Sequence, residues 1–339
     1  MIGGYFIQSY GNFSQWIGLA ACLIFPLACI EQQEPTESPS ARNVFEASEE
    51  SMVNPSPGGA SAFGEEAEAR SSRGCLIRPP SGEKFYSHEE TEVPYIIQIP
   101  NSYDGSVEYP VIFAFHGHTR THIHCRDTDC MGLDDAARGE AVLVYMKSIG
   151  RGWVADEAGF SEDSLGRNLA FFDFVLDELR ADYCIDEEQI FVTGTSSGGY
   201  FSNYLGCVRG NVLQGIAPVG GAIPFTDEST CESSVAAMII HGVDDPHVTF
   251  AAGQESRDFL RSAASCSPTE SELEALHARI RTARDARRET QECMTFQDCT
   301  ESITWCEHSV GGYDGSTHGW PPFAGEAIWS FFKSSPTRP

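Results

Sequence analysis

The sequence predicts an α/β fold in which a mostly parallel β-sheet is covered by helices on both faces. From Cys75 onward, short apolar segments alternate with longer segments whose apolar residues recur at helical spacing. The short segments are apolar throughout, without the every-other-residue pattern of a strand that faces water on one side. Such strands are buried on both faces, and residues 75–339 are sufficient for one domain of this kind.

The apolar segments give the expected strands, which are residues 94–99, 111–115, 141–146, 189–192, 215–219, 235–240 and 303–306. The helical spacing gives the expected helices, which are residues 165–183, 197–207, 253–264 and 325–332. Residues 269–290 are dense in Glu and Arg and place Leu273, Leu276 and Ile280 on one stripe. This pattern predicts a helical insertion at the surface.

The N-terminal part of the chain contains an apolar run at residues 16–30. Its length is typical of the apolar core of a signal peptide and short for a membrane span, so residues 1–30 are expected to be a signal peptide or a lipoprotein signal. No Lys or Arg precedes Arg42, however, so the usual positive start of such a signal is missing. Cys22, after Leu-Ala-Ala, and Cys29, at the end of the run, are the alternative lipidation sites, and plain secretion is a third possibility.

Residues 31–74 are rich in Glu, Ser, Pro, Gly and Ala and contain few large apolar residues. A segment of this composition buries too little apolar surface to offset the entropy lost on ordering. We therefore expect a disordered acidic linker that precedes a folded domain at residues 75–339.

The charge balance restricts the possible partners. The chain has 22 basic and 49 acidic residues, which gives a formal net charge of -27. Such a charge argues against nucleic acid and against anionic lipid as ligands.

The ten cysteines that follow Cys29 are dispersed and even in number. In an exported chain this pattern predicts disulfides, and no spacing of the kind used for zinc is present. Short loops favour Cys125 with Cys130 and Cys299 with Cys306, but the connectivity stays open at this point.

A Gly-x-Ser-x-Gly pentapeptide lies where the expected strand 189–192 leads into the expected helix 197–207. The small residues Gly194 and Gly198 allow a sharp strand-to-helix turn that exposes the hydroxyl of Ser196. We interpret Ser196 as a nucleophile, with the backbone N–H of Ser197 at the helix start as an oxyanion donor. The alternative for a short Gly/Ser-rich motif is an ordinary loop.

A serine nucleophile needs a base and an acid that orients the base. An acidic pair, Asp244 and Asp245, follows the expected strand 235–240, and His318 lies in a glycine-rich loop after the strand 303–306. These positions follow the chain order nucleophile, acid, histidine.

The chain resembles the secreted α/β-hydrolases that include feruloyl esterases and polyhydroxybutyrate depolymerases. The motifs that carry the resemblance are His116-Gly117 and the segments 194–199, 241–248 and 318–321. The fourth motif has Thr317 where the family has Gly and keeps the spacing from His to Trp. The resemblance implies an α/β-hydrolase fold at residues 75–339.

The resemblance also assigns the residues. Ser196, Asp245 and His318 would form the catalytic triad, Asp244 would be a turn residue, and the second oxyanion N–H would come from His118.

Several other residues of the sequence could also have a functional role. The histidines of residues 116–124 could suggest a metal site, but His116 belongs to the strand-end dipeptide of the resemblance, and His122 and His124 are expected to line a loop. Residues 127–132 are similar to the start of a calcium loop, but Met131 and Arg138 stand where oxygen ligands are required, so neither a metal nor a cofactor is predicted. Trp153 and Trp320 are either core residues or walls of a substrate groove, and Trp320, beside the candidate histidine, is expected in the groove.

The expected function is a secreted or surface-tethered carboxylic ester hydrolase, a serine esterase of the feruloyl esterase kind acting on esters of plant cell-wall polysaccharide. A polyhydroxybutyrate depolymerase is the first alternative, because the same triad would serve it. A surface binding module on a hydrolase fold is the second. The expected partners are therefore ester substrates, with no nucleic acid, and a membrane tether through Cys22 or Cys29 if the chain is lipidated.

Overall fold

The computed structural model describes residues 75–76, 78–156, 159–224, 231, 234–267, 269–313 and 315–335. All of them belong to one compact unit, Glu66–Pro339. The expected signal segment, the two lipidation candidates and the expected linker lie outside the described residues. Within the described ranges, no helix combines the length and the apolar character that crossing a membrane requires.

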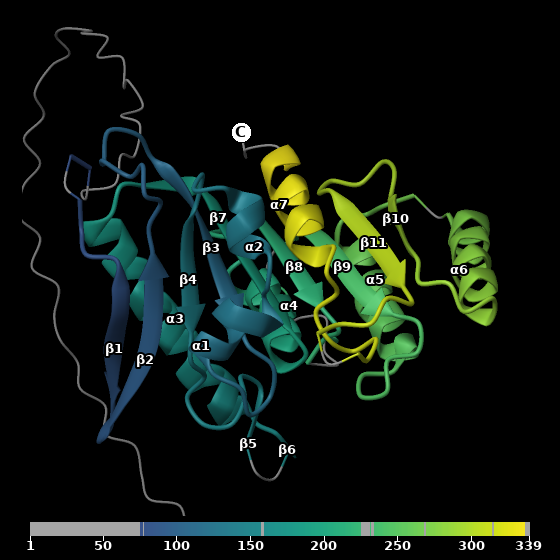
Figure 1. Ribbon diagram of the computed structural model, residues 1–339, viewed down its shortest axis with the longest axis horizontal. Helices are drawn as coiled ribbons and strands as arrows, with labels where there is room; N and C mark the ends of the chain where they lie inside the picture. Colours follow the sequence, from purple (N-terminus) through teal and green to yellow (C-terminus); the bar gives the residue numbers. More distant parts are fainter. Residues whose placement is uncertain are drawn as a thin grey trace, which may run out of the picture. The chain divides into compact units, whose positions relative to one another are not determined.

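The centre of the fold is a nine-stranded sheet with the order β1-β2-β4-β3-β7-β8-β9-β11-β10 (Figure 1). Its strands are β1 Gly82–His88, β2 Thr91–Gln98, β3 Tyr109–Phe115, β4 Val142–Met146, β7 Ile185–Thr195, β8 Gly215–Val219, β9 Ala236–Gly242, β10 Gln291–Thr295 and β11 Ile303–His308. The six strands from β4 to β11 pair in parallel, and β1, β2 and β10 are antiparallel to their neighbours. The prediction of a mostly parallel sheet is confirmed.

Helices cover both faces of this sheet. They are α1 His122–His124, α2 Leu133–Ala137, α3 Glu162–Asp182, α4 Ser197–Val208, α5 Phe250–Ala263, α6 Glu270–Asp285 and α7 Ala324–Ser334, with a π-helical turn at Cys125–Asp129 and a hairpin of β5 Ala155–Asp156 and β6 Gly159–Phe160. Along β3, Phe113 packs in the core layer that contains residues of α3, α4 and α5, whereas Ile112 and Ala114 pack in the layer that contains residues of α2 and α7. Successive side chains of a strand point to opposite faces, which explains why these strands are apolar throughout.

The stripe expected on residues 269–290 is buried. Leu273, Leu276 and Ile280 of α6 are each at most 5% exposed. His277 on the same helix bonds through Nδ1 to the buried carboxylate of Glu307 on β11, at 2.8 Å. The segment after α6 then forms β10 at the edge of the sheet.

The ten cysteines of the described domain form five disulfides. They are Cys75–Cys184, Cys125–Cys130, Cys207–Cys231, Cys266–Cys299 and Cys293–Cys306. The expected pair Cys125–Cys130 is confirmed, and the expected pair Cys299–Cys306 is wrong. Cys306 lies directly opposite Cys293 in the pairing of β10 with β11, a partner that closeness in sequence could not reveal.

Candidate active site

Ser196 occupies the turn between the end of β7 and the start of α4. Its backbone has φ 54° and ψ −117°. A positive φ strains a residue that carries a side chain, by about 1–3 kcal/mol, and persists only where the surroundings enforce it. Here the N–H of Ser196 donates to the carbonyl of Val219 on β8 at 2.9 Å, which holds the turn in place.

The two glycines of the pentapeptide are required by close backbone contacts. A Cβ on Gly194 would lie 2.7 Å from the carbonyl of Gly198, and a Cβ on Gly198 would lie 2.2 Å from the carbonyl oxygen of Phe115 on β3. Neither contact can be relieved by a side-chain rotation, because the atoms approached belong to the backbone. The sharp turn predicted at Ser196 therefore requires glycine at both positions.

The structure brings Asp245 and His318 together. Asp245 follows β9, and His318 lies in the loop between β11 and α7. Nδ1 of His318 is 2.8 Å from Oδ2 of Asp245, which assigns the proton of this bond to Nδ1 and leaves Nε2 to accept a proton. Asp244 lies outside this pair: its exposed carboxylate bonds with Arg284 on α6 at 2.7 Å.

The carboxylate of Asp245 is held in its charged form. Its second oxygen, Oδ1, accepts the N–H groups of His247 and Val248, both at 2.8 Å. Burial alone would raise the pKa of Asp245, but the hydrogen bonds from His318, His247 and Val248 lower the pKa below its ordinary value. An anionic carboxylate can orient an imidazole and balance its positive charge.

Two further glycines support the pair, and the sequence analysis missed both. Gly220 has φ +55°, and a Cβ there would lie 3.0 Å from the carbonyl oxygen of His318 and 3.4 Å from Oδ2 of Asp245. A Cβ on Gly242 would lie 2.2 Å from the carbonyl oxygen of Thr317. The signal that could have revealed them is their position, because Gly220 and Gly242 each follow a predicted strand at the edge of the sheet where the site lies.

The second predicted oxyanion donor, His118, lies in the loop after β3. Gly117 of this loop is beside the candidate nucleophile, since a Cβ on Gly117 would be 3.7 Å from Cβ of Ser196. The ring of His116 is buried, and burial lowers its pKa to about 3, so the ring is neutral. Its Nδ1 donates to the carbonyl of Gly117 at 2.6 Å, and its Nε2 accepts the N–H of Ser148 at 3.0 Å.

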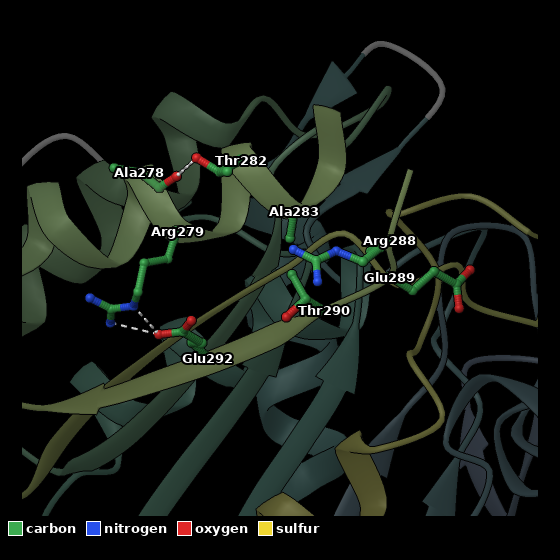
Figure 2. A pocket seen from close by; sticks show the side chains of 8 residues that line it. All are labelled: Ala278, Arg279, Thr282, Ala283, Arg288, Glu289, Thr290 and Glu292. Carbon is green, nitrogen blue, oxygen red and sulfur yellow. Dashed lines mark hydrogen bonds and ion pairs between the residues drawn. The ribbon is translucent and has the colours of Figure 1, made fainter. Parts of the chain in front are cut away.

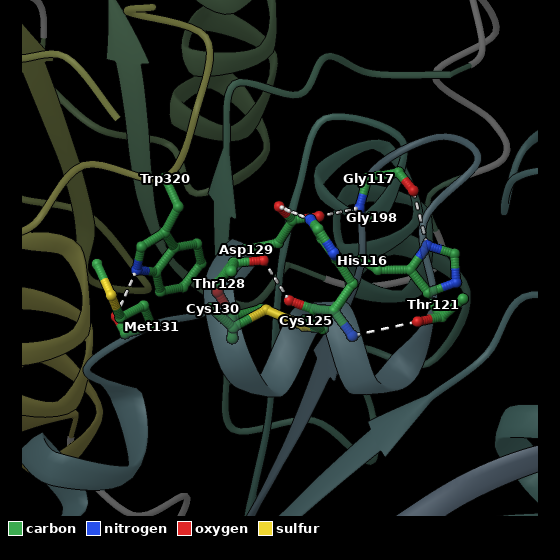
Figure 3. The surroundings of a disulfide bond; sticks show 12 residues. His116, Gly117, Thr121, Cys125, Thr128, Asp129, Cys130, Met131, Gly198 and Trp320 are labelled. Carbon is green, nitrogen blue, oxygen red and sulfur yellow. Dashed lines mark hydrogen bonds and ion pairs between the residues drawn. A yellow bond between two sulfur atoms is a disulfide. The ribbon is translucent and has the colours of Figure 1, made fainter. Parts of the chain in front are cut away.

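The predicted substrate walls, Trp153 and Trp320, are not walls of a groove. Trp153 is 0% exposed and Trp320 is 1% exposed. The indole N–H of Trp320 donates to the carbonyl of Met131 at 2.9 Å, beside the segment that carries the disulfide Cys125–Cys130 (Figure 3). Both tryptophans are core residues whose indole N–H groups are hydrogen-bonded, as the alternative to groove walls predicts.

A cleft of about 440 Å³ contains Ser196 and His318. The residues that line it come from several loops at the carboxyl ends of the strands: Gly117, His118, Thr119, Arg120, Asp129, Thr195, Ser196, His247, Tyr313, His318 and Gly319. Among the described residues that line the cleft, Tyr313 carries an aromatic ring other than an imidazole. Its hydroxyl is 3.2 Å from Nε2 of His124, and the two rings meet edge to face.

Asp129 forms the buried side of the cleft. Its Oδ2 accepts the N–H of Gly117 at 3.4 Å (Figure 3). Its Oδ1 is 3.5 Å from Nε2 of His124. Burial raises the pKa of this carboxyl. The disulfide Cys125–Cys130 closes the short turn that presents Asp129 to the loop of Gly117.

A second hollow, of about 500 Å³, lies between α6 and β10 (Figure 2). Arg279 and Glu292 form an ion pair at its edge, at 2.6 Å, and Arg288 lies on its other side. None of the predicted site residues lines this hollow, and its lining residues include no serine, cysteine or histidine. The cleft that contains Ser196 and His318 is the candidate active site.

The histidines of residues 116–124 do not converge. His116 bonds to the backbone, and His122 bonds through Nε2 to Glu83 at 2.8 Å. In the described part of the chain, no group of three His, Cys, Asp or Glu side chains is arranged to hold a metal ion.

The mostly parallel sheet covered by helices on both faces is that of the α/β-hydrolase fold, and the comparisons with known proteins agree. Residues 156–283 match the family described as phospholipase/carboxylesterase. The chain is 25% identical over 256 residues to a probable feruloyl esterase C of Aspergillus niger, covering 73% of this chain and 86% of the relative. It is 25% identical over 249 residues to feruloyl esterase C of Emericella nidulans, covering 71% and 84%.

Among solved structures, the chain is similar to a ferulic acid esterase from Anaeromyces mucronatus that was determined with ferulic acid. The TM-score is 0.50 at 14% identity, with 80% of this chain and 93% of the other covered. At this identity the likeness speaks for the fold. The chain has the α/β-hydrolase fold, residues 156–283 match the phospholipase/carboxylesterase family, and proteins named feruloyl esterase are its distant homologues.

Proposed function

We propose that this protein is a serine carboxylic ester hydrolase of the feruloyl esterase kind, with Ser196 as nucleophile, His318 as general base and acid, and Asp245 as the acid that orients His318. The observation that carries the proposal is the 2.8 Å bond between His318 and Asp245 in the same cleft as the strained Ser196. A nucleophile, a base and an orienting acid on three separate loops are the parts that acyl transfer requires.

The reaction follows from these roles. Nε2 of His318 takes the proton of Ser196 while Oγ attacks the ester carbonyl, which gives a tetrahedral intermediate with a negative oxygen. His318 then returns the proton to the leaving alcohol as the bond from carbon to that oxygen breaks, leaving an acyl-enzyme. Water, deprotonated by His318, attacks the acyl-enzyme and releases the acid and free Ser196.

The negative oxygen of the intermediate needs donors that are already in place. The N–H of Ser197 is the first of α4, where the helix dipole favours negative charge. The N–H of His118 would supply the second donor from the loop after β3.

The acyl group is the finer part of the proposal. Two relatives are named feruloyl esterases, and Tyr313 offers an aromatic ring in the cleft that is 38% exposed. A hydroxycinnamoyl group can stack on such a ring, with a gain of about 1 kcal/mol beyond the burial of its area. We therefore assign esters of hydroxycinnamic acids, such as those of plant cell-wall polysaccharide, as the substrate class.

The five disulfides indicate an oxidising compartment, which agrees with export from the cytoplasm. We extend the proposal to a secreted or surface-tethered enzyme, with Cys22 or Cys29 as the site of a lipid anchor. Metabolic labelling with a radioactive fatty acid tests the anchor. Label that persists in the double variant Cys22→Ser/Cys29→Ser would place the lipid on another residue, and no label in the wild type would leave secretion without an anchor.

The function is tested by parallel assays of methyl ferulate, short-chain nitrophenyl esters and polyhydroxybutyrate with the wild type and with Ser196→Ala. We expect hydrolysis of methyl ferulate by the wild type, and less than about one thousandth of that rate for the variant, since loss of a triad member costs more than this factor. Circular dichroism should be identical for both proteins. Clearing of polyhydroxybutyrate with no release of ferulate would replace the proposed substrate with a polyester.

A further inference from the structure

The loop that follows β4, residues 148–153, lies at the same edge of the sheet as the candidate oxyanion donors. β4 pairs in parallel with β3, so the loops that follow the two strands emerge side by side. The loop after β3 carries His118, and the turn after β7, the next strand along, carries Ser197. The sequence motifs do not include residues 148–153, and the only role predicted in this loop was that of Trp153 as a possible groove wall.

The loop after β4 bonds to the loop after β3 at two backbone positions. The N–H of Ser148 donates to Nε2 of His116 at 3.0 Å. The carbonyl of Arg151 accepts the N–H of Thr119 at 2.7 Å. These two bonds bracket Gly117 and His118, so they fix the course of the backbone that would present the N–H of His118.

Trp153 bonds to both sides of the candidate oxyanion site. Its indole N–H donates to the carbonyl of His116 at 2.9 Å, and its backbone N–H donates to Oγ of Ser197 at 3.0 Å. Both bonds are buried, and the indole packs between Phe115 and Phe201, with ring centroids 4.8 and 5.1 Å away. One residue thus connects the loop after β3 with the first turn of α4.

Gly152 allows this close approach. A Cβ there would lie 2.8 Å from Nδ1 of His118 and 3.0 Å from Oγ of Ser197. Asn168 on α3 fixes the loop from behind, because its Oδ1 accepts the N–H of Ile149 at 2.8 Å and its Nδ2 donates to the carbonyl of Trp153 at 3.1 Å. Asn168 is fully buried, so these bonds are shielded from water.

We propose that residues 148–153 are the element that sets the spacing between the N–H groups of His118 and Ser197, and that Trp153 is its principal positioning residue. The inference rests on the proposed function, because the two N–H groups matter as a pair only if an oxyanion forms between them. The two donors come from separate segments of chain, and such groups must be held within about 0.5 Å of the productive geometry. Trp153 is bonded to both segments and can hold that distance.

The test is Trp153→Phe, which keeps an aromatic ring in the core and removes the indole N–H that bonds to His116. We expect kcat for nitrophenyl acetate to fall about tenfold to hundredfold with little change in KM, because a misplaced donor weakens transition-state binding more than substrate binding. The affinity for a trifluoromethyl ketone, which forms a tetrahedral adduct, should fall by a similar factor, and the affinity for the product acid should stay constant. Direct loss of an oxyanion donor costs about 100- to 1000-fold.

The matched control is Trp329→Phe on α7. Trp329 is 3% exposed, and its indole N–H has no hydrogen-bond partner among the described residues. This control makes the same change of side chain in the core without touching the oxyanion segments. It should keep kcat and the affinity for the ketone.

The inference is overturned if Trp153→Phe keeps kcat and ketone affinity within about twofold of the wild type, a change of less than about 0.5 kcal/mol in the barrier. It is equally overturned if Trp329→Phe loses as much activity. Should Trp153→Phe fail to fold, Ser197→Ala gives the same test, because it removes the acceptor of the Trp153 backbone N–H and keeps the N–H of residue 197. A wild type that cleaves nitrophenyl acetate but not methyl ferulate would contradict the proposed substrate and leave this test intact.

Discussion

Asp245 and His318 are 73 residues apart in the chain, and their side chains meet at 2.8 Å. The neighbouring carboxylate of Asp244 points to Arg284 of α6 instead. The turn in which Asp245 accepts two backbone N–H groups fixes which of the two carboxylates faces the histidine. The structure therefore distinguishes the adjacent residues Asp244 and Asp245, which have the same side chain: Asp245 contacts the histidine and Asp244 does not.

We expect Asp245→Asn to lower kcat about ten-thousandfold, as loss of the orienting acid does in serine proteases. Asp244→Asn should change kcat little, because it removes an exposed ion pair. Steady-state kinetics on one ester for both variants decides the matter. A larger loss for Asp244→Asn would mean that Asp244, and not Asp245, is the orienting acid.

Gly198→Ala tests the packing of the turn at Ser196. The added methyl would press on the carbonyl oxygen of Phe115, so we expect a loss of stability of about 1–3 kcal/mol or more, or failure to fold. Gly166→Ala on α3 is the matched control, since a Cβ there meets nothing within 4 Å. That variant should gain about 0.4–1 kcal/mol, measured by urea unfolding. Equal effects at the two positions would contradict the crowded turn.

The central strands could be predicted because their burial on both faces makes them apolar throughout. β1 and β10, at the two edges of the sheet, were missed because only alternate residues are even partly buried and the rest face solvent. The sequence pattern of such edge strands is close to that of a polar loop. Their place in the sheet comes from pairing with β2 and β11, which is tertiary information.

The predicted triad residues lie on motifs whose spacing follows from backbone geometry, so they could be proposed from the sequence. The burial of Trp153 and Trp320 could not be predicted from the sequence. The local sequence around a tryptophan in a loop is the same whether the residue is buried under the loop or exposed in a groove. The supporting glycine Gly220 was missed for a related reason. Its need for a positive φ and for close contact with His318 appears only when β8 and the His318 loop are in place.

The buried histidines predict instability in acid. Burial lowers the pKa of His308 to about 4 and that of His116 to about 3, whereas both would titrate near 6.5 in the unfolded chain. The unfolded state therefore binds more protons below pH 6.5, so the free energy of unfolding falls as the pH falls from 6.5 towards the folded pKa values. Each histidine contributes a slope of up to about 1.4 kcal/mol for each pH unit.

The variant His308→Gln measures the contribution of His308 to the pH dependence of stability. Glutamine does not titrate, and its amide can still donate to the carbonyl of Val310, which Nδ1 of His308 faces. Urea unfolding at pH 7 and pH 5 should show a smaller loss of stability for the variant than for the wild type. His88→Gln, in the edge strand β1, is the control and should lose as much stability as the wild type between these pH values. Equal losses for His308→Gln and the wild type would show that His308 is not a buried neutral group.

The last prediction concerns the acyl group and Tyr313, which takes the place that the sequence analysis gave to Trp320. If the ring of Tyr313 stacks on the acyl group, Tyr313→Ala should lower the ratio of kcat/KM for methyl ferulate to that for methyl butyrate by about fivefold, which corresponds to about 1 kcal/mol of stacking. Both esters have the same leaving group, so the ratio isolates the acyl side. Tyr313→Phe keeps the ring and removes the hydroxyl that lies 3.2 Å from His124, so it should keep the ratio. A fall for Tyr313→Phe as large as that for Tyr313→Ala would mean that the hydroxyl selects the acyl group, and an unchanged ratio in both variants would remove Tyr313 from acyl recognition.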